Sequence, residues 1–280
     1  MTDNVALNDV NKEIKDSSES RRLIIVTGDK GGVGKSTFAR ALIQTYIDNK
    51  KDFLGFDADL SNPQIKRFYG EECDISPLNI FKSGTIDIFV QNLRSFIYLD
   101  SKQEGGEKLP GKSLFLLELP PQSSNILRDF VSEMDLFNIV KESYNMRVTL
   151  VVVINRTIDS VNQLVGLHEY CKEQGDYIVV KNNFFGESED FHRYNNSSLI
   201  KEIKEKQKKE NNQYFYEICM PELIEHAYDY VDANSCTFSQ AIAQDEMIAV
   251  KGRVTAWLRN FKQSIEPVKG LLGLKDVTLQ

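Results

Sequence analysis

Four glycines and two lysines stand close together in TGDKGGVGKST, which runs from Thr27 to Thr37. The part from Gly28 to Ser36 has the spacing G-x-x-x-x-G-K-[ST], a pattern that binds phosphate groups. Glycines let the backbone turn tightly, so that successive N–H groups point at phosphate oxygens. The apolar run at 23–28 predicts a strand before the pattern, and a helical pattern follows it. This context favours a nucleotide-phosphate site over a glycine-rich turn without a ligand.

The last residues of the pattern carry the charge and the metal chemistry. We expect Lys35 to neutralise the β- and γ-phosphates, while the Ser36 hydroxyl completes the shell of a Mg²⁺ ion. The expected ligands are therefore ATP and Mg²⁺. The residues expected to contact the nucleotide here are Asp29, Lys30, Gly31, Gly32, Val33, Gly34, Lys35, Ser36 and Thr37.

The early lysine, Lys30, needs a separate account because one lysine is enough to hold a phosphate. KGGVGKST resembles the deviant Walker A sequence of the ParA/MinD family of ATPases. In that family the early lysine reaches across a nucleotide-sandwich dimer to the phosphates of the partner subunit. The resemblance implies a homodimer that forms on ATP binding, with Lys30 and Lys35 both catalytic. The alternative is an exposed loop lysine.

Two aspartates follow the second apolar run, in FDADLSNPQ at 56–64. The resemblance implies that Asp59 orients the attacking water and that Asp57 helps to place water or Mg²⁺. A carboxylate suits both tasks, since it accepts protons and ligates a hard cation. The alternative is that the two side chains cap the loop after the strand.

The segment LLELPPQSS at 116–124 departs from the family pattern. The resemblance implies a switch loop that senses the γ-phosphate, with an aspartate before the prolines holding the Mg²⁺ water shell. Here that residue is Glu118, and Gln122 replaces the glycine that usually follows the prolines. The metal site expected from the sequence is therefore Ser36, Asp57 and Glu118, and hydrolysis is expected to be slow or differently gated.

Base recognition often uses an asparagine at the end of a later strand. YIVVKNNFF at 177–185 offers Asn182 and Asn183, and Asn155 is a competitor. An amide presents both a donor and an acceptor to a base edge, but asparagine is also common in turns, so all three remain open. The segment at 220–233 stands where relatives place a loop against the base, with Pro221 near the base.

Alternating apolar runs and helical patterns predict an α/β fold, with a mostly parallel central sheet and helices on both faces. It is the fold expected of a P-loop NTPase of the deviant Walker A type. The expected strands are 23–28, 53–58, 114–119, 147–154 and 176–182. The expected helices are 36–50, 84–99, 125–142 and 159–175, the last with Asp159 as its N-cap and Gly175 as its stop.

The chain is expected to hold one domain. A polar leader at 1–20 precedes an ATPase domain at 21–265, which carries a polar insertion at 185–212. The second half of the insertion predicts an exposed helix, either a solvated face or a partner-binding surface. The tail at 266–280 is expected to fray, because two glycines and an aspartate weaken its amphipathic pattern.

Composition excludes several classes of protein. A net charge of −7 over 280 residues argues against a chain that coats nucleic acid unaided, although a local basic patch stays open. We expect neither a signal peptide nor a membrane-spanning helix, since the sequence shows neither pattern. The cysteines and histidines show no CxxC pair and no metal-ligand spacing, which favours reduced thiols and a cytoplasmic protein. These residues are Cys73, Cys171, Cys219, Cys236, His168, His192 and His226.

The family resemblance implies an ATP-gated dimeric switch with weak or partner-stimulated ATPase activity. Its relatives act in plasmid or DNA partition, stability or mobilisation, through a DNA-bound or adaptor protein and in some cases non-specific DNA. A membrane-positioning switch like MinD is the first alternative, with 268–279 as its amphipathic segment. A metabolic or metal-cluster enzyme is disfavoured, since none of the four cysteines lies near the phosphate or switch motifs.

Overall fold

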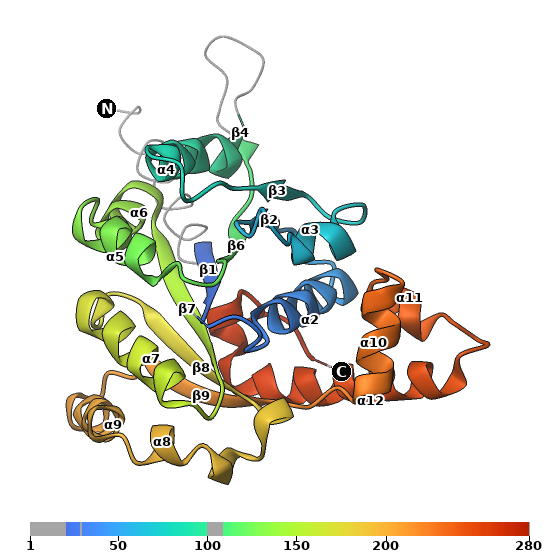
Figure 1. Ribbon diagram of the computed structural model, residues 1–280. Coiled ribbons are helices and arrows are strands. Elements are labelled where there is room, and N and C mark those ends of the chain that lie inside the picture. Colours follow the sequence, from blue (N-terminus) through green and yellow to red (C-terminus); the bar gives the residue numbers. More distant parts are fainter. Residues whose placement is uncertain (1–20, 29, 100–108, 280) are drawn as a thin grey trace.

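The computed structural model describes residues 21–28, 30–99 and 109–279, and its centre is a seven-stranded sheet (Figure 1). Its strands are β1 (Arg21–Thr27), β2 (Leu54–Asp57), β3 (Ile75–Pro77), β6 (Leu114–Glu118), β7 (Met146–Ile154), β8 (Asp176–Asn182) and β9 (Phe215–Met220). They lie in the order β3-β2-β6-β1-β7-β8-β9, and all neighbours pair in parallel. β4 (Tyr98–Leu99) and β5 (Leu109–Pro110) form a separate antiparallel pair.

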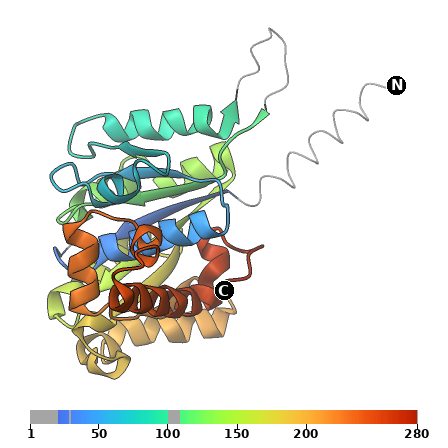
Figure 2. The ribbon, with the colours of Figure 1, turned by 90° about the vertical axis from the view of Figure 1, so that its right-hand side faces the viewer.

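Helices cover both faces of the sheet, which confirms the predicted α/β class (Figures 1 and 2). One face packs against α4 (Thr85–Ile97), α5 (Ser124–Ser132), α6 (Leu136–Tyr144), α7 (Ile158–Cys171), α8 (His192–Asn195) and α9 (Ser198–Glu210). The other packs against α2 (Lys35–Asp48), α3 (Gln64–Tyr69), α10 (Glu225–Ala233), α11 (Phe238–Ile242), α12 (Ile248–Ile265) and the 3₁₀ helix η3 (Glu266–Leu272). Because both faces are covered, the central strands read as continuous apolar runs.

The five predicted strands match β1, β2, β6, β7 and β8, but the two edge strands were not predicted. β3 has only three residues, which is too short for a periodic signal. β9 reads FYEICM, with a glutamate inside it, and only Phe215, Ile218 and Met220 of it are buried. Edge strands lack the continuous apolar run that identifies strands buried on both faces.

The single helix predicted at 125–142 is wrong, because the chain forms α5 and α6 there with a break between them. Asp135 in the break has φ 52°, a left-handed conformation that aspartate tolerates better than most residues. The caps of the next predicted helix are also wrong. Thr157 occupies the N-cap position of α7, Asp159 lies in its first turn, and the helix ends at Cys171 rather than at Gly175.

The polar stretch 185–212 belongs to the crossover between β8 and β9. Two parallel neighbours require such a crossover, which here consists of the 3₁₀ helices η1 (Asn183–Phe185) and η2 (Ser188–Asp190) followed by α8 and α9. The helix expected in its second half is α9, whose Ile200 and Ile203 are buried while its lysines and glutamates remain largely exposed. The stretch therefore connects two neighbouring strands of the sheet.

The expectation of a frayed tail is wrong for the described residues from 266 onward. Val268, Leu272 and Leu274 are buried in the core that α2 and α12 share. The hydroxyl of Tyr46 donates to the Leu272 carbonyl at 2.8 Å. The apolar side chains of 268–279 that suggested a membrane-binding segment are largely used inside the fold.

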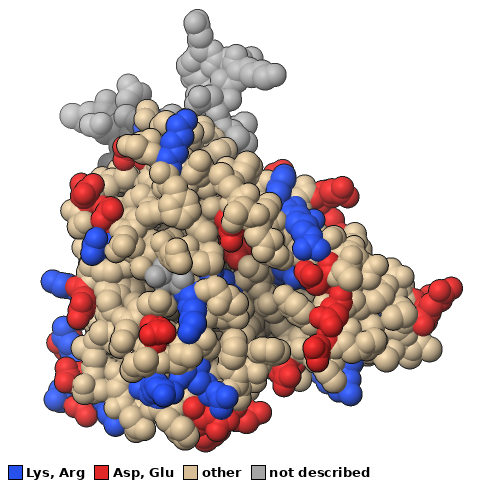
Figure 3. All heavy atoms as spheres, in the orientation of Figure 1, with Lys and Arg blue, Asp and Glu red and all other residues tan. Residues whose placement is uncertain are grey.

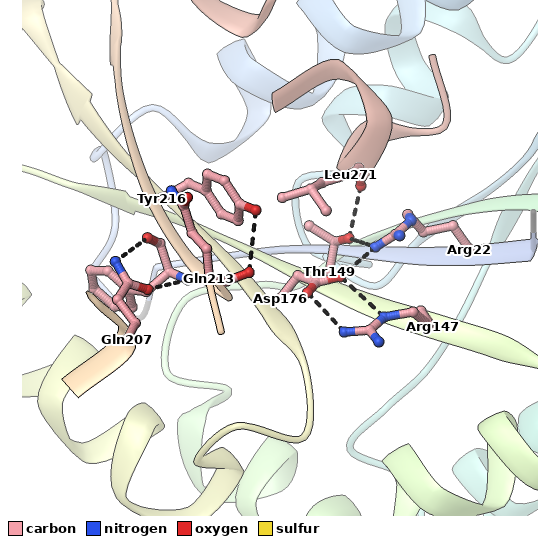
Figure 4. Close-up of polar contacts among 9 residues, drawn as sticks. Arg22, Arg147, Thr149, Asp176, Gln207, Gln213, Tyr216 and Leu271 are labelled. Atoms are coloured by element: carbon pink, nitrogen blue, oxygen red, sulfur yellow. Dashed lines mark hydrogen bonds and ion pairs between the residues drawn. The ribbon is translucent and has the colours of Figure 1, made fainter. Parts of the chain in front are cut away.

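Figure 4 shows a polar network around the buried Thr149 and Asp176, and it holds this segment against the amino ends of the strands. The Thr149 hydroxyl donates to the Leu271 carbonyl at 2.7 Å and accepts from Nη1 of Arg22 at 2.8 Å. Asp176 is also buried, and its carboxylate accepts from Nη1 of Arg22 at 2.7 Å and from Nη2 of Arg147 at 2.9 Å. Pairing by two guanidinium groups keeps this carboxylate from being an isolated buried charge.

Replacing Thr149 by valine should destabilise the fold by about 1–2 kcal/mol, since the Leu271 carbonyl then loses its buried donor. Urea unfolding of the whole chain measures the change. Thr255→Val is the matched control, because the Thr255 hydroxyl bonds a helix carbonyl at an exposed position. Equal stability of the two variants would contradict an anchoring role for Thr149.

Candidate nucleotide-binding site

The phosphate loop connects β1 to α2 at the carboxyl edge of the sheet, in the strand–loop–helix context that the sequence predicted. Gly34 has φ 102°, and a Cβ placed on it would lie 2.5 Å from Nδ2 of Asn182. At Gly28, a Cβ would lie 2.6 Å from the carbonyl oxygen of Val153. Only glycine fits at these two positions, so the loop lies tightly against β7 and β8.

Lys35 lies inside the loop. It is 6% exposed, and its Nζ donates to the carbonyls of Gly28 at 2.8 Å and Lys30 at 3.2 Å. These bonds hold the Lys35 side chain folded back against the loop that ends at Lys35. A phosphate in the loop would meet this ammonium together with the N–H groups at the start of α2.

Ser36 and Glu118 form a pair beneath the loop. The Ser36 hydroxyl donates to Oε1 of Glu118 at 2.5 Å. Glu118 is 2% exposed, and its Oε2 accepts no hydrogen bond from the residues that the structure describes. Burial raises the pKa of this carboxyl to about 7. An unused carboxylate oxygen beside a serine hydroxyl fits a hard cation such as Mg²⁺, which takes oxygen ligands and releases protons from them.

Asp57 pairs with Glu118 across β2 and β6 and is fully buried. Its two oxygens accept from the backbone N–H groups of Asp59 at 3.2 Å and Lys66 at 3.0 Å. Burial raises its pKa to about 6. Asp57 therefore fixes the loop after β2 and the start of α3, and it lies beside Glu118, where it could hold a metal-bound water.

Asp59 is half-buried and closes its own turn. Its Oδ1 accepts from the Ser61 hydroxyl at 2.6 Å and from the Asn62 N–H at 3.1 Å. These are the contacts of the loop-capping alternative that the sequence left open. Its expected role in orienting water stays a prediction.

In the switch segment after β6, Gln122 stands where the family has a glycine, and it adopts a backbone conformation that glycine favours. Gln122 has φ 61°, in the left-handed region that favours glycine. Next to it, the buried Ser123 hydroxyl donates to the Pro120 carbonyl at 2.8 Å. The Pro121 ring lies near Gly31, since a Cβ on that glycine would be 3.9 Å from the ring. The segment thus touches the phosphate loop, and Gln122 places local strain there.

Lys30 differs from Lys35 in its surroundings. Its side chain is 39% exposed, and its Nζ lies 3.6 Å from Oδ2 of Asp159 at the start of α7. This is a surface ion pair, which contributes little to stability and can open easily. Asp29, which the sequence also assigns to the nucleotide, lies outside the described residues.

The three candidate asparagines have different roles in this structure. The Asn182 amide donates to the Val33 carbonyl at 2.9 Å and accepts from the Phe184 N–H at 3.1 Å. Asn183 donates to Oε2 of Glu187 at 3.1 Å. Asn155 accepts from the Thr157 N–H at 3.0 Å and so serves the turn into α7. Asn182 is the asparagine in contact with the phosphate loop, as a clamp rather than a free amide.

Pro221 follows β9, and its carbonyl accepts from Nε1 of Trp257 at 2.8 Å. The residue before it, Met220, lies against the loop, since a Cβ on Gly34 would be 3.1 Å from its Cε. Sequence reasoning missed Met220 because β9 was not predicted. Charges of both signs are interspersed over the face shown in Figure 3, without a continuous basic field.

The parallel sheet and this loop define the chain as a P-loop nucleotide-binding protein. The sequence profile of the CobQ/CobB/MinD/ParA nucleotide-binding domain matches residues 24–229, and the chain belongs to that family. The ParA/MinD resemblance drawn from the loop is thereby confirmed.

Sequence identity to the similar proteins that follow is low. Protein MobD of Acidithiobacillus ferrooxidans is 23% identical over 252 residues, which cover 89% of this chain and 98% of MobD. A nucleotide-binding protein from Archaeoglobus fulgidus, solved with ADP, aligns with TM-score 0.39 and 19% identity over 89% of this chain and 96% of its own. MinD in the MinC:MinD complex of Aquifex aeolicus aligns with TM-score 0.38 and 16% identity over 85% and 95%.

Proposed function

We propose that this protein is an ATP-binding, slowly hydrolysing switch that dimerises when it binds ATP and Mg²⁺, and that it acts in DNA partition, plasmid stability or mobilisation. The contrast between the two loop lysines supports this proposal best. Lys35 is enclosed and bonded within its own loop, whereas Lys30 lies on the open face in a weak ion pair. Lys35 serves its own subunit, and Lys30 serves the partner's triphosphate.

Exposed apolar side chains around the loop support a second copy as the covering surface. Leu60 follows β2 and is 47% exposed, and Ile158 opens α7 and is 49% exposed. Both stand at the carboxyl edge of the sheet, and Ile158 is next to the Asp159 that holds Lys30. Burial of this edge in a dimer removes apolar area from water and brings Lys30 near the partner's nucleotide.

Slow turnover follows from the switch segment and the metal carboxyl. Glu118 replaces the family's aspartate, and its longer side chain changes the distance from the strand to a metal-bound water. Gln122 holds a left-handed backbone where glycine adapts more freely. We expect an adaptor or DNA-bound partner to stimulate hydrolysis by rearranging this segment.

A role in mobilisation is favoured over a role in positioning at a membrane. Family membership gives the nucleotide-binding domain, and similarity to Protein MobD along nearly the whole of both chains supports the mobilisation branch over the membrane-positioning branch. The segment that suggested membrane binding packs its leucines inside the fold. No helix in the described part of the chain is long and apolar enough to cross a bilayer.

Replacing Lys30 by alanine tests the dimer. We expect ATP-driven dimerisation to weaken by about thirtyfold or more, because truncating one member of a buried charge pair costs about 2–5 kcal/mol. Light scattering of the whole protein with Mg²⁺ and ATP, at several concentrations, measures the change. Affinity for ADP should stay within about twofold, since Lys30 does not serve its own nucleotide.

Asp159→Asn is the control for local disturbance, because it opens the same surface ion pair and leaves Lys30 in place. That variant should still dimerise. A wild-type protein that stays monomeric at saturating ATP and Mg²⁺ would refute the switch. If DNA is also a direct ligand, its binding should need ATP and should fall steeply with salt.

A further inference from the structure

The direction in which a nucleotide lies across the site follows from the positions of the charged groups. Glu118 and Asp57 stand at the carboxyl ends of β6 and β2, on one side of the phosphate loop. On the other side, Gly34 packs against Asn182 and Met220 at the ends of β8 and β9. If the site binds ATP as proposed above, the metal and terminal phosphates lie toward the carboxylates. The nucleoside then lies toward β8 and β9.

Two exposed apolar side chains stand beyond those two strands. Phe184, on η1, is 59% exposed, and Ile224, just before α10, is 42% exposed. β8 and β9 end in register, with Asn182 opposite Met220, so the loops that carry the two side chains start side by side. An exposed aromatic ring at the edge of a ligand site gains free energy when a flat base covers it.

The turn that carries Phe184 is fixed to the phosphate loop. One side chain makes the link, because Asn182 accepts from the Phe184 N–H and donates to the Val33 carbonyl. The next ring, Phe185, meets the Phe184 ring edge-on, with centroids 5.2 Å apart. The buried Lys181 donates to Oδ1 of Asn195 at 2.9 Å and so holds the far end of the same segment. A ring held on such a rigid turn loses little entropy when a base stacks on it.

We propose that Phe184 is the stacking platform for the nucleotide base and that Ile224 supplies a second apolar contact. The Asn182 amide donates to the Val33 carbonyl and accepts from the Phe184 N–H, so this asparagine positions the platform against the phosphate loop. The free energy of stacking depends on the size of the base's ring system and not on its hydrogen-bonding groups. The site therefore selects purine over pyrimidine nucleotides.

Calorimetry with two ligands tests the platform. ADP carries a base and leaves the proposed ATP dimer unformed, whereas inorganic tripolyphosphate carries only phosphates. We expect Phe184→Ala to weaken ADP binding about tenfold, leave tripolyphosphate binding unchanged, and remove the preference for ADP over CDP. Phe184→Trp should retain ADP binding. Phe81→Ala is the matched control, because Phe81 is 60% exposed at the same edge, beyond β3, and should leave both ligands unaffected.

Several outcomes would overturn the assignment. ADP affinity within twofold of wild type in Phe184→Ala would do so, as would an equal loss with tripolyphosphate, which would show that the turn acts on the phosphates. Unchanged ADP affinity with lost ATP-driven dimerisation would assign Phe184 to the subunit interface instead. A wild-type protein that binds neither ADP nor tripolyphosphate would instead refute the nucleotide site itself, and one that binds ADP but stays monomeric with ATP and Mg²⁺ would refute only the switch.

Discussion

Replacing Lys35 by alanine should lower the affinity for ATP and Mg²⁺ by about a hundredfold or more. The Lys35 ammonium is enclosed by its loop, where it now bonds the carbonyls of Gly28 and Lys30. With ATP bound, the same donors face phosphate oxygens, and each hydrogen bond between charged groups contributes about 1.5–3 kcal/mol. Two such bonds account for the expected loss. Calorimetric titration of the whole protein measures it.

The control is a second lysine-to-alanine substitution, at a position far from the phosphate loop. Lys112→Ala removes a lysine at the amino end of β6, where Nζ pairs with Asp52 and Asp74 on the opposite edge of the sheet. ATP affinity should not change there. Circular dichroism should show both variants folded. A Lys35→Ala protein that binds ATP within threefold of wild type would mean that the loop does not hold the phosphates.

The elements next to the phosphate loop were predictable because they are defined by local patterns. β1, β6, β7 and β8 are buried on both faces, so their apolar runs identify them without tertiary information. The spacing from Gly28 to Ser36 determines a loop, a helix start and a lysine position together. The class of fold and the loop between β1 and α2 therefore followed from short stretches of sequence.

Features that depend on distant contacts were not predictable. The tail at 266–279 contains glycines and charges, yet it is ordered by the carbonyls of Leu271 and Leu272, which Thr149 and Tyr46 bond from remote strands and helices. Asn182 was one of three candidate base readers, and its clamp on Val33 depends on how β8 lies beside the loop. No pattern within either segment encodes such a contact.

The Glu118 carboxyl makes the unliganded protein's stability depend on pH. Burial raises its pKa from the ordinary 4.5 to about 7. Between these values the unfolded chain is ionised while the folded chain holds the proton, so the free energy of unfolding falls as pH rises through this window. The shift corresponds to roughly 3 kcal/mol, fully lost above pH 7. Asp57, with a pKa raised to about 6, adds a slope of the same sign.

Replacing Glu118 by glutamine should therefore raise the stability of the ligand-free protein at pH 8 by roughly 3 kcal/mol and leave it unchanged near pH 4.5. The introduced amide oxygen would still accept from the Ser36 hydroxyl, so the gain isolates the buried charge. Urea unfolding between pH 4.5 and 8 measures it, with the exposed Glu246→Gln as a control that should change stability by less than about 0.5 kcal/mol. If the free energy of unfolding depends on pH in the same way in wild type and Glu118→Gln, the Glu118 carboxyl is not the source of the pH dependence.

With ATP and Mg²⁺ bound, the wild-type protein should be more stable at pH 8 than Glu118→Gln, the reverse of the order without ligand. A cation beside Ser36 and Glu118 compensates the buried carboxylate, so ATP with Mg²⁺ should stabilise the wild-type protein far more than Glu118→Gln at pH 8. A carboxylate that costs stability without its ligand and gains it with the ligand couples folding of the switch segment to nucleotide occupancy. That coupling is what an ATP-gated switch requires. A stabilisation by ATP and Mg²⁺ that is equal in both proteins would separate Glu118 from the metal.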